Sequence, residues 1–98
     1  MAIAEISIVP IGTETTSVSN HVAAVIAKLQ ELGVAHELNA MGTVIEGEMK
    51  YLLDIIRQLH EVPFSVGASR VYTTIKIDDR RDKEMSGKDK IDSVQEKL

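Results

Sequence analysis

Apolar and polar residues alternate along the start of the chain, and this period of two predicts a half-buried strand over residues 2–10. Pro10 ends the strand, and Glu5, Ser7 and Val9 share one of its faces. The apolar residues that follow recur at steps of four and three, which is the spacing of one stripe along a helix. The residues of this stripe are Val18, Val22, Val25, Leu29 and Leu32.

Capping and turn residues mark where the next elements begin and end. Thr16 or Ser17 is the expected N-cap of the first helix, and Gly33 is the expected left-handed residue after its last turn. Alternation resumes over residues 34–41, which predicts a second strand, and Gly42 is the natural turn residue after it. The remaining pattern predicts a short strand over 43–47, a helix from Met49 that stops before Pro63, a long strand over 65–78, a charged segment over 78–90 and a short helix over 89–98.

The order strand, helix, strand, strand, helix, strand most simply forms a ferredoxin-like α+β sandwich, with two helices on one face of a four-stranded antiparallel sheet. We expect a single domain over residues 1–98, with the charged segment and the last helix as a C-terminal appendage. Val71, Thr73, Ile75 and Ile77 of the last strand should point towards the core.

The opposite face of such a sheet is left uncovered by the helices. Its side chains are either solvated, as on many antiparallel sheets, or packed against a second copy of the chain. The long last strand offers a second contact along its free edge, so we expect a homo-oligomer, a tetramer built as a dimer of dimers. The residues expected on this face are Glu5, Ser7, Val9, Glu37, Asn39, Met41, Arg70, Tyr72, Thr74 and Lys76.

Composition narrows the classes of function. The 98 residues carry 11 basic and 15 acidic side chains, and this net charge of −4 argues against a nucleic-acid-binding protein. The absence of cysteine excludes disulfides and thiolate metal sites, and it fits a reducing compartment. The first residues lack the basic region of a signal peptide, and no apolar stretch approaches the ~20 residues of a membrane span. We therefore expect a cytoplasmic protein that does not bind membranes.

No set of residues points to catalysis or metal binding. The histidines are His21, His36 and His60, and no two of them have the spacing of a helical metal pair. The loop after the first strand, PIGTETTS, carries Glu14 and no basic residue that would hold a phosphate. We expect no catalytic residue, no metal ligand and no cofactor beyond a bound small molecule.

Three segments resemble the small YkoF-like thiamine-binding family: ISIVPIGT, NAMGTVIEGEM and RVYTTIKIDDRRDK. The resemblance covers essentially the whole chain in order, and GTVIEG and IKIDDRRDK are its more specific parts. It implies a ferredoxin-like homotetramer that binds thiamine or its hydroxymethylpyrimidine half, without established catalysis.

The hairpin segment NAMGTVIEG, residues 39–47, has the chemistry that such a ligand needs. The Glu46 carboxylate can accept a hydrogen bond from an aminopyrimidine, and Thr43 and Asn39 can add directional hydrogen bonds. Gly42 and Gly47 allow a ligand to approach the backbone closely. The remaining candidates are Ile11 and Gly12 as an apolar wall and Tyr72 as a stacking or cation–π partner.

Other interpretations of the same residues stay open. Both glycines can serve turns, and Glu46 can be a helix N-terminal charge that the helix dipole favours. The alternative function is a structural or regulatory oligomer without a thiamine ligand. An enzyme of thiamine salvage ranks below both, because the chain shows no nucleophile and no metal set.

Overall fold

Seven elements form the fold in a computed structural model that describes residues 1–98. In chain order they are β1 (Ala2–Pro10), α1 (Ser19–Glu31), β2 (His36–Asn39), β3 (Gly42–Gly47), α2 (Met49–Ser65), β4 (Val71–Asp79) and α3 (Gly87–Gln95).

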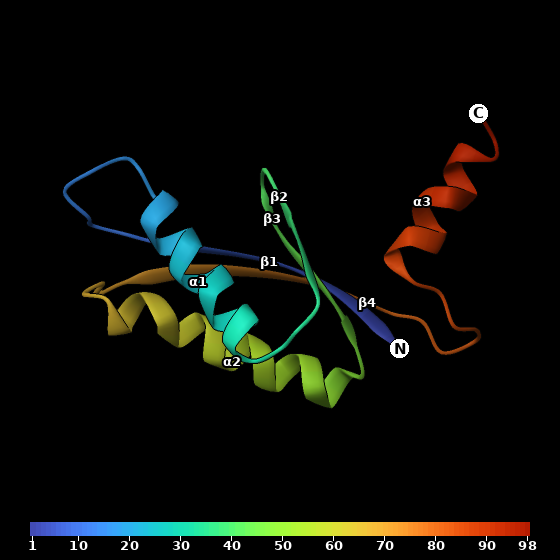
Figure 1. Cartoon of the computed structure of the whole chain (residues 1–98), viewed down its shortest axis with the longest axis horizontal. Coiled ribbons are helices and arrows are strands. Elements are labelled where there is room, and N and C mark those ends of the chain that lie inside the picture. The colour runs from blue at the N-terminus through green and yellow to red at the C-terminus, as the bar shows by residue number, and fades with distance from the viewer.

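The four strands make one antiparallel sheet in the order β2-β3-β1-β4, and α1 and α2 lie together on one side of it (Figure 1). The central strand β1 pairs with β3 along one edge and with β4 along the other, so the two halves of the chain meet at β1. This is the predicted ferredoxin-like sandwich, with α3 added after the last strand. None of the three helices is long and apolar enough to cross a bilayer.

The core lies between the sheet and the first two helices. β1 alternates as predicted, with one face buried under the helices, and it meets the apolar stripes of α1 and α2 there. The fully buried side chains of Leu29 and Leu59 come from these two helices, and Ile45 comes from β3. α3 contributes no buried residue to this core.

The hairpin turn precedes the predicted turn residue Gly42, and β2 ends two residues earlier than predicted. β2 ends at Asn39, which pairs with Gly42, so Ala40 and Met41 form the turn. Gly42 is therefore the first residue of β3, and Met41 does not lie on the uncovered face. Glycine is needed at this position because β1 lies close to it: an added Cβ would lie 3.1 Å from Cγ of Glu5 and 3.1 Å from the backbone oxygen of Ile6.

Three element boundaries also differ from prediction. Val18, which makes no side-chain cap, precedes α1 in place of Thr16 or Ser17. α2 continues past Pro63 to Ser65, because a proline in the last turn costs the helix only one hydrogen bond while its ring is buried against the core. The N–H groups of Val66 and Ala68 then donate to the oxygen of Pro63, and this turn delays β4 until Val71.

The cap at the end of α1 is confirmed, with Gly33 at φ 69 directly after the last turn. The inward register of β4 is also confirmed, but its burial is incomplete. Ile75 and Ile77 point to the helix side and are 42% and 39% exposed, because β4 is an edge strand that the helices do not cover fully.

The side of the sheet opposite α1 and α2, called the bare face below, carries mixed polar and apolar side chains. At its centre Lys76 lies 3.4 Å from the carboxylate of Glu5 in an ion pair. Cross-strand pairing places the following residues on the bare face: Ile3, Glu5, Ser7, Val9, Glu37, Asn39, Val44, Glu46, Tyr72, Thr74, Lys76 and Asp78.

Candidate functional site

β1 is longer than the hairpin that pairs with it. Its ladder with β3 runs from Ala2 to Ile6 only, whereas its ladder with β4 continues to Pro10. The residues from Ser7 to Val9 therefore have a strand partner on one side and a bare backbone edge on the other.

A cavity of about 250 Å³ lies beside this bare edge. The tip of the β2–β3 hairpin forms one wall, the first two turns of α1 form another, and Leu59 of α2 reaches its floor. Val18, which directly precedes α1, and Val22 in its first turn line the cavity beyond the end of the β1–β3 ladder. The site is thus a consequence of unequal strand lengths.

The lining is mostly apolar and carries no charged side chain. Its polar residues are Ser7, Asn39 and Thr43, and Thr43 is the buried polar residue of the sheet, with 7% of its surface exposed. Such a site can hold a small flat ring through apolar contacts and orient it through a few hydrogen bonds to hydroxyl, amide and strand-edge backbone groups.

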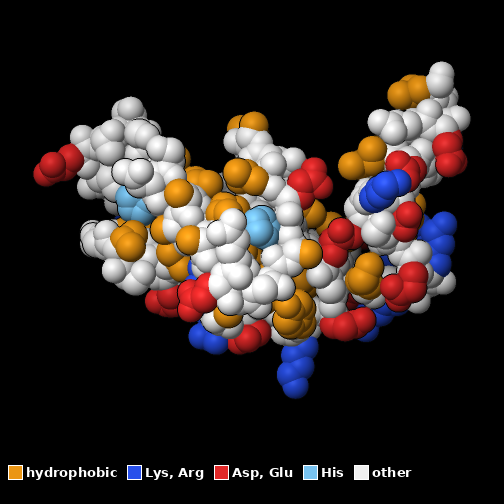
Figure 2. Space-filling view, in the orientation of Figure 1, with side chains coloured by type: hydrophobic (Ala, Val, Ile, Leu, Met, Phe, Trp, Pro, Cys, Tyr) orange, Lys and Arg blue, Asp and Glu red, His pale blue; other side chains and the backbone are white.

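The hairpin tip adds exposed apolar side chains to the wall of the cavity. Leu38 and Met41 line it and are 56% and 85% exposed, and Figure 2 shows apolar atoms at the free end of this hairpin. Met41 lies in the two-residue turn, so its flexible side chain can adapt to an occupant of the cavity.

Three of the residues predicted from the sequence meet at this cavity, namely Asn39, Gly42 and Thr43. Ile11, Gly12 and Tyr72 lie at the same end of the sheet but outside the lining. The N–H of Ile11 donates to the oxygen of Arg70 at 2.8 Å, which continues the β1–β4 ladder, and Gly12 follows at φ 82. Tyr72 pairs with Val9 on the bare face and is 63% exposed.

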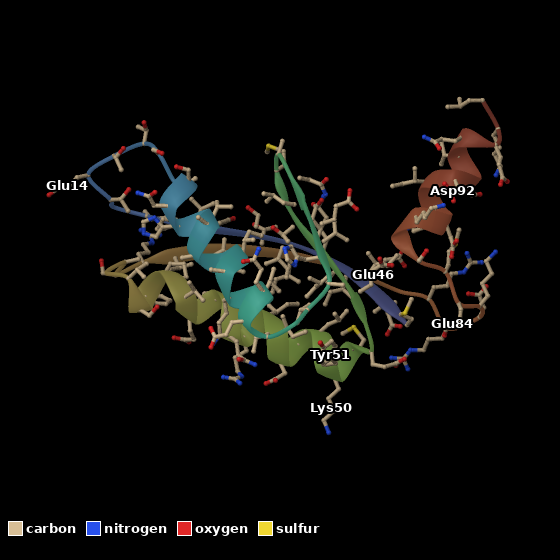
Figure 3. The ribbon with its side chains drawn as sticks, in the orientation of Figure 1. Glu14, Glu46, Lys50, Tyr51, Glu84 and Asp92 are labelled. Carbon is tan, nitrogen blue, oxygen red and sulfur yellow. The ribbon has the colours of Figure 1, made fainter.

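Glu46 and Gly47 lie at the opposite end of β3. Glu46 follows Thr43 by three positions, a span of about 10 Å along a strand. The Glu46 carboxylate accepts a 2.6 Å hydrogen bond from the N–H of Gly87, the first residue of α3, and Figure 3 shows it between the sheet and that helix. A Cβ at Gly47 would lie 3.1 Å from Cδ1 of Tyr51, so this glycine accommodates an α2 side chain.

Sequence reasoning missed the apolar walls of the cavity, which are Val18, Val22, Leu38 and the edge of β1. The valines were assigned to the helix stripe, which is correct for their face but does not show that the sheet stops short of them. A hairpin shorter than β1 indicates that part of the β1 edge has no strand partner. The predicted turn at Gly42 made the hairpin longer than it is, so this difference in length was not predicted.

The carboxyl groups with shifted pKa values lie away from the cavity. Hydrogen bonds from Arg81 and Arg80 lower the pKa of the exposed Asp79 and Asp82 carboxyls, in the segment that leads to α3. Two histidines have structural partners, because His36 Nδ1 bonds the oxygen of Val34 at 2.9 Å and His60 Nδ1 bonds Oγ1 of Thr73 at 2.7 Å. No acidic, basic or histidine side chain lines the cavity.

Comparison with known proteins identifies the family. The sequence model of the family described as thiamine-binding protein matches residues 4–95. The chain belongs to this family.

Relatives of the same length extend this finding. UPF0045 protein YqgV of Bacillus subtilis is 48% identical over 102 residues, with 100% of this chain and 98% of the relative covered. A UPF0045 protein of Methanothermobacter thermautotrophicus is 43% identical over 99 residues, with both chains covered completely. The resemblance predicted from ISIVPIGT, NAMGTVIEGEM and RVYTTIKIDDRRDK is thereby confirmed at the level of the family.

Solved structures agree with the fold. The crystal structure of a hypothetical protein from Methanocaldococcus jannaschii superposes with a TM-score of 0.84 at 35% identity, covering 97% of this chain and 96% of that one. A Thermotoga maritima protein, named as a candidate for thiamine biosynthesis or salvage, has a TM-score of 0.77 at 20% identity, with 95% and 97% covered. At that identity the second likeness shows the fold alone.

Proposed function

We propose that the protein binds thiamine, or its hydroxymethylpyrimidine half, in the cavity between the β2–β3 hairpin and α1. Membership of the thiamine-binding protein family carries the choice of ligand, and the uncharged cavity supports the choice of site. A volume of about 250 Å³ is at the small end of ligand pockets, which suits a single substituted ring better than a large cofactor.

The lining matches the groups on an aminopyrimidine. The ring presents an amino donor beside ring-nitrogen acceptors, and the hydroxyl of Thr43 and the amide of Asn39 can serve either type of group. The free edge of β1 at Ser7 to Val9 adds backbone N–H and C=O groups, and Gly42 leaves the ring room to approach the hairpin. Apolar contacts from Val18 and Val22 would cover the ring faces.

The other predicted residues take more distant roles in this proposal. Ile11, Gly12 and Tyr72 would contact a ligand only where it extends past the end of β1, as the thiazolium of thiamine would. Glu46 and Gly47 would reach a ligand only at the other end of the sheet, and Glu46 would first have to release Gly87.

We also propose that the protein is a homo-oligomer, a tetramer assembled from two kinds of contact. The bare face supplies one contact, and the free edge of β4 supplies the other. Ile75 and Ile77 support the second contact, because strand pairing along β4 would cover these partly exposed side chains.

The alternative, a structural or regulatory oligomer without this ligand, is favoured by a specific observation. Glu46, the carboxylate in the segment that carries the family resemblance, holds the N-terminus of α3 in place. On this view the hairpin sequence serves assembly. Ligand titration separates the two functions.

The test is calorimetric titration of thiamine, and separately of hydroxymethylpyrimidine, into the protein and into Thr43→Val. Valine keeps the shape of threonine without its hydroxyl, so we expect saturable binding to the wild type and a loss of about tenfold in the variant, the value of one hydrogen bond. Thr74→Val is the matched control, because Thr74 lies on the bare face outside the cavity. It should bind like the wild type.

A second readout is thermal unfolding. Ligand at about 100-fold excess over Kd should stabilise the folded protein by roughly 2.7 kcal/mol per site. If neither compound produces heat or raises the melting temperature at millimolar concentration, the proposed function is wrong. Equal losses in Thr43→Val and Thr74→Val would reject the cavity as the site.

A further inference from the structure

The C-terminal helix α3 has no packing partner within its own chain. None of its residues is buried, although Ile91, Val94 and Leu98 recur at helical spacing and are 54%, 60% and 99% exposed. A helix of nine residues is marginal in water when nothing covers its apolar stripe. α3 is therefore an amphipathic helix whose apolar side is exposed to solvent.

The start of α3 is held at the rim of the bare face. The Glu46 carboxylate bonds the N–H of Gly87, and Lys90 forms an ion pair with Asp78. Glu46 and Asp78 both belong to the bare face, so α3 departs from the side of the sheet that α1 and α2 leave open. Figures 1 and 3 show the helix standing clear of the rest of the molecule from this anchored end.

The bare face is suited to being covered. Its central carboxylate, Glu5, already pairs with Lys76, and Glu46 and Asp78 have partners at the rim. A second surface can therefore lie over the centre without leaving these charges unpaired, which would be costly. Val9 and Tyr72 are exposed there and offer apolar contacts.

The bare face alone is too small for a stable interface. Four strands about 4.8 Å apart and at most nine residues long give at most about 600 Å², since residues rise about 3.3 Å along a strand. A stable association buries about 800 Å² on each partner. One face of α3, about 13 Å long, is apolar surface of the right kind to supply the remainder.

We propose that α3 is a clasp for a second copy of this chain. Two copies pack bare face to bare face, and the apolar stripe of each α3 closes on the flank of its partner. The two surfaces are on the same chain, and α3 starts at the rim of the bare face, so a single twofold axis can satisfy both contacts. This inference rests on the self-association proposed above and names the element that completes it.

The clasp is tested with Ile91→Asp/Val94→Asp, which places charge in the stripe. Because α3 contributes nothing to the core, the variant should retain the wild-type circular dichroism of the remaining fold. We expect its dimerisation constant, measured by sedimentation equilibrium, to weaken at least 100-fold. Leu53→Asp is the matched control, because Leu53 is 49% exposed on α2, away from the bare face.

A mixture of isotope-labelled and unlabelled chains locates the contact. Filtered nuclear Overhauser spectra should show intermolecular contacts from the methyl groups of Ile91 and Val94 to Val9, Val44 or Tyr72. Intermolecular contacts of α3 to Leu53 and the helix side only would overturn the proposal.

The outcomes separate this inference from the earlier proposals. A monomeric wild-type protein removes both the proposed oligomer and the clasp. An oligomer that Ile91→Asp/Val94→Asp leaves unchanged removes the clasp alone. Thiamine titration of the same samples reports on the proposed ligand directly, because neither Ile91 nor Val94 lines the cavity.

Discussion

At the scale of single residues, Gly42 and Gly87 show that glycines in one chain serve different needs. Gly42 is in a strand next to β1, and its missing side chain leaves room for Glu5 and for the Ile6 carbonyl. Gly87 begins α3, where an added Cβ would lie 3.7 Å from the Glu46 carboxylate, an ordinary contact. The sequence does not distinguish the two glycines, because the atoms that surround each one belong to residues far away along the chain.

We expect Gly42→Ala to lower the free energy of unfolding by about 1–3 kcal/mol, because the Ile6 backbone oxygen cannot move away from the new methyl group. Urea denaturation measures the change. Gly87→Ala is the control and should stay within about 0.5 kcal/mol of the wild type. Equal stabilities for the two variants would contradict the assigned close approach.

At the scale of elements, periodicity predicts the interior of each helix and strand, whereas local hydrogen bonds decide where each one ends. The stripe of α1 and the alternation of β1 were predicted correctly from apolar spacing. The end of α2 was predicted incorrectly, because a proline in a last turn is tolerated when its ring is buried. The turn was misplaced because glycine at position 42 fits both a turn and a close strand contact.

The start of α3 is a capping box. Ser86 accepts a hydrogen bond from the N–H of Asp89, and the Asp89 carboxylate accepts one from the N–H of Ser86. These bonds lower the pKa of Asp89 below its ordinary value. A carboxyl whose pKa is lower in the folded helix stabilises it above the ordinary pKa of about 4, and that stabilisation is lost as pH falls through the folded value.

We therefore expect α3 to lose helix as pH falls below about 4 while the sheet stays folded. Carbon chemical shifts of residues 88–95 between pH 7 and pH 2.5 measure this loss. The experiment is done in high salt, which weakens the Lys88–Asp92 and Lys90–Asp78 ion pairs. It is done in a Glu46→Gln background, which removes the carboxylate that also accepts from the N–H of Gly87, so that the cap is the remaining carboxylate contact at the start of α3. In Asp89→Asn the same shifts should hardly change with pH. A pH-dependent loss of equal size in this variant would reject the role of the cap.

At the scale of the whole molecule, the fold could be predicted from the order of elements, but the cavity could not. Antiparallel neighbours and right-handed crossovers leave few arrangements for this order, and the ferredoxin-like sheet is the simplest. The cavity depends on how far the hairpin reaches along β1, a difference of a few residues that alternation does not report. Asn39, Gly42 and Thr43 were chosen for their chemistry and lie at the cavity, whereas Glu46, chosen in the same way, lies beside α3.

The stability of the molecule should be uneven along its length. Amide protons of β1 lie between two strand partners over most of that strand, so they should exchange only through global unfolding, with protection of about 10³ or more. Amides of α3 should exchange nearly freely in dilute solution and become protected as concentration rises. Hydrogen exchange at two concentrations checks both expectations. Strong protection of α3 in a monomeric sample would show that the helix is stable on its own.

The position of the two-residue turn at Ala40 and Met41 sets the size of the cavity, so insertions in the hairpin would change the space available to a ligand. Adding two residues to each arm of the hairpin would extend β3 alongside Ser7 to Val9 without changing which face each side chain occupies. The new rungs would occupy the space now open to a ligand, while the core residues stayed the same. In this architecture the depth of the cavity is therefore adjustable in steps of one strand period, through chain length and independently of side-chain chemistry.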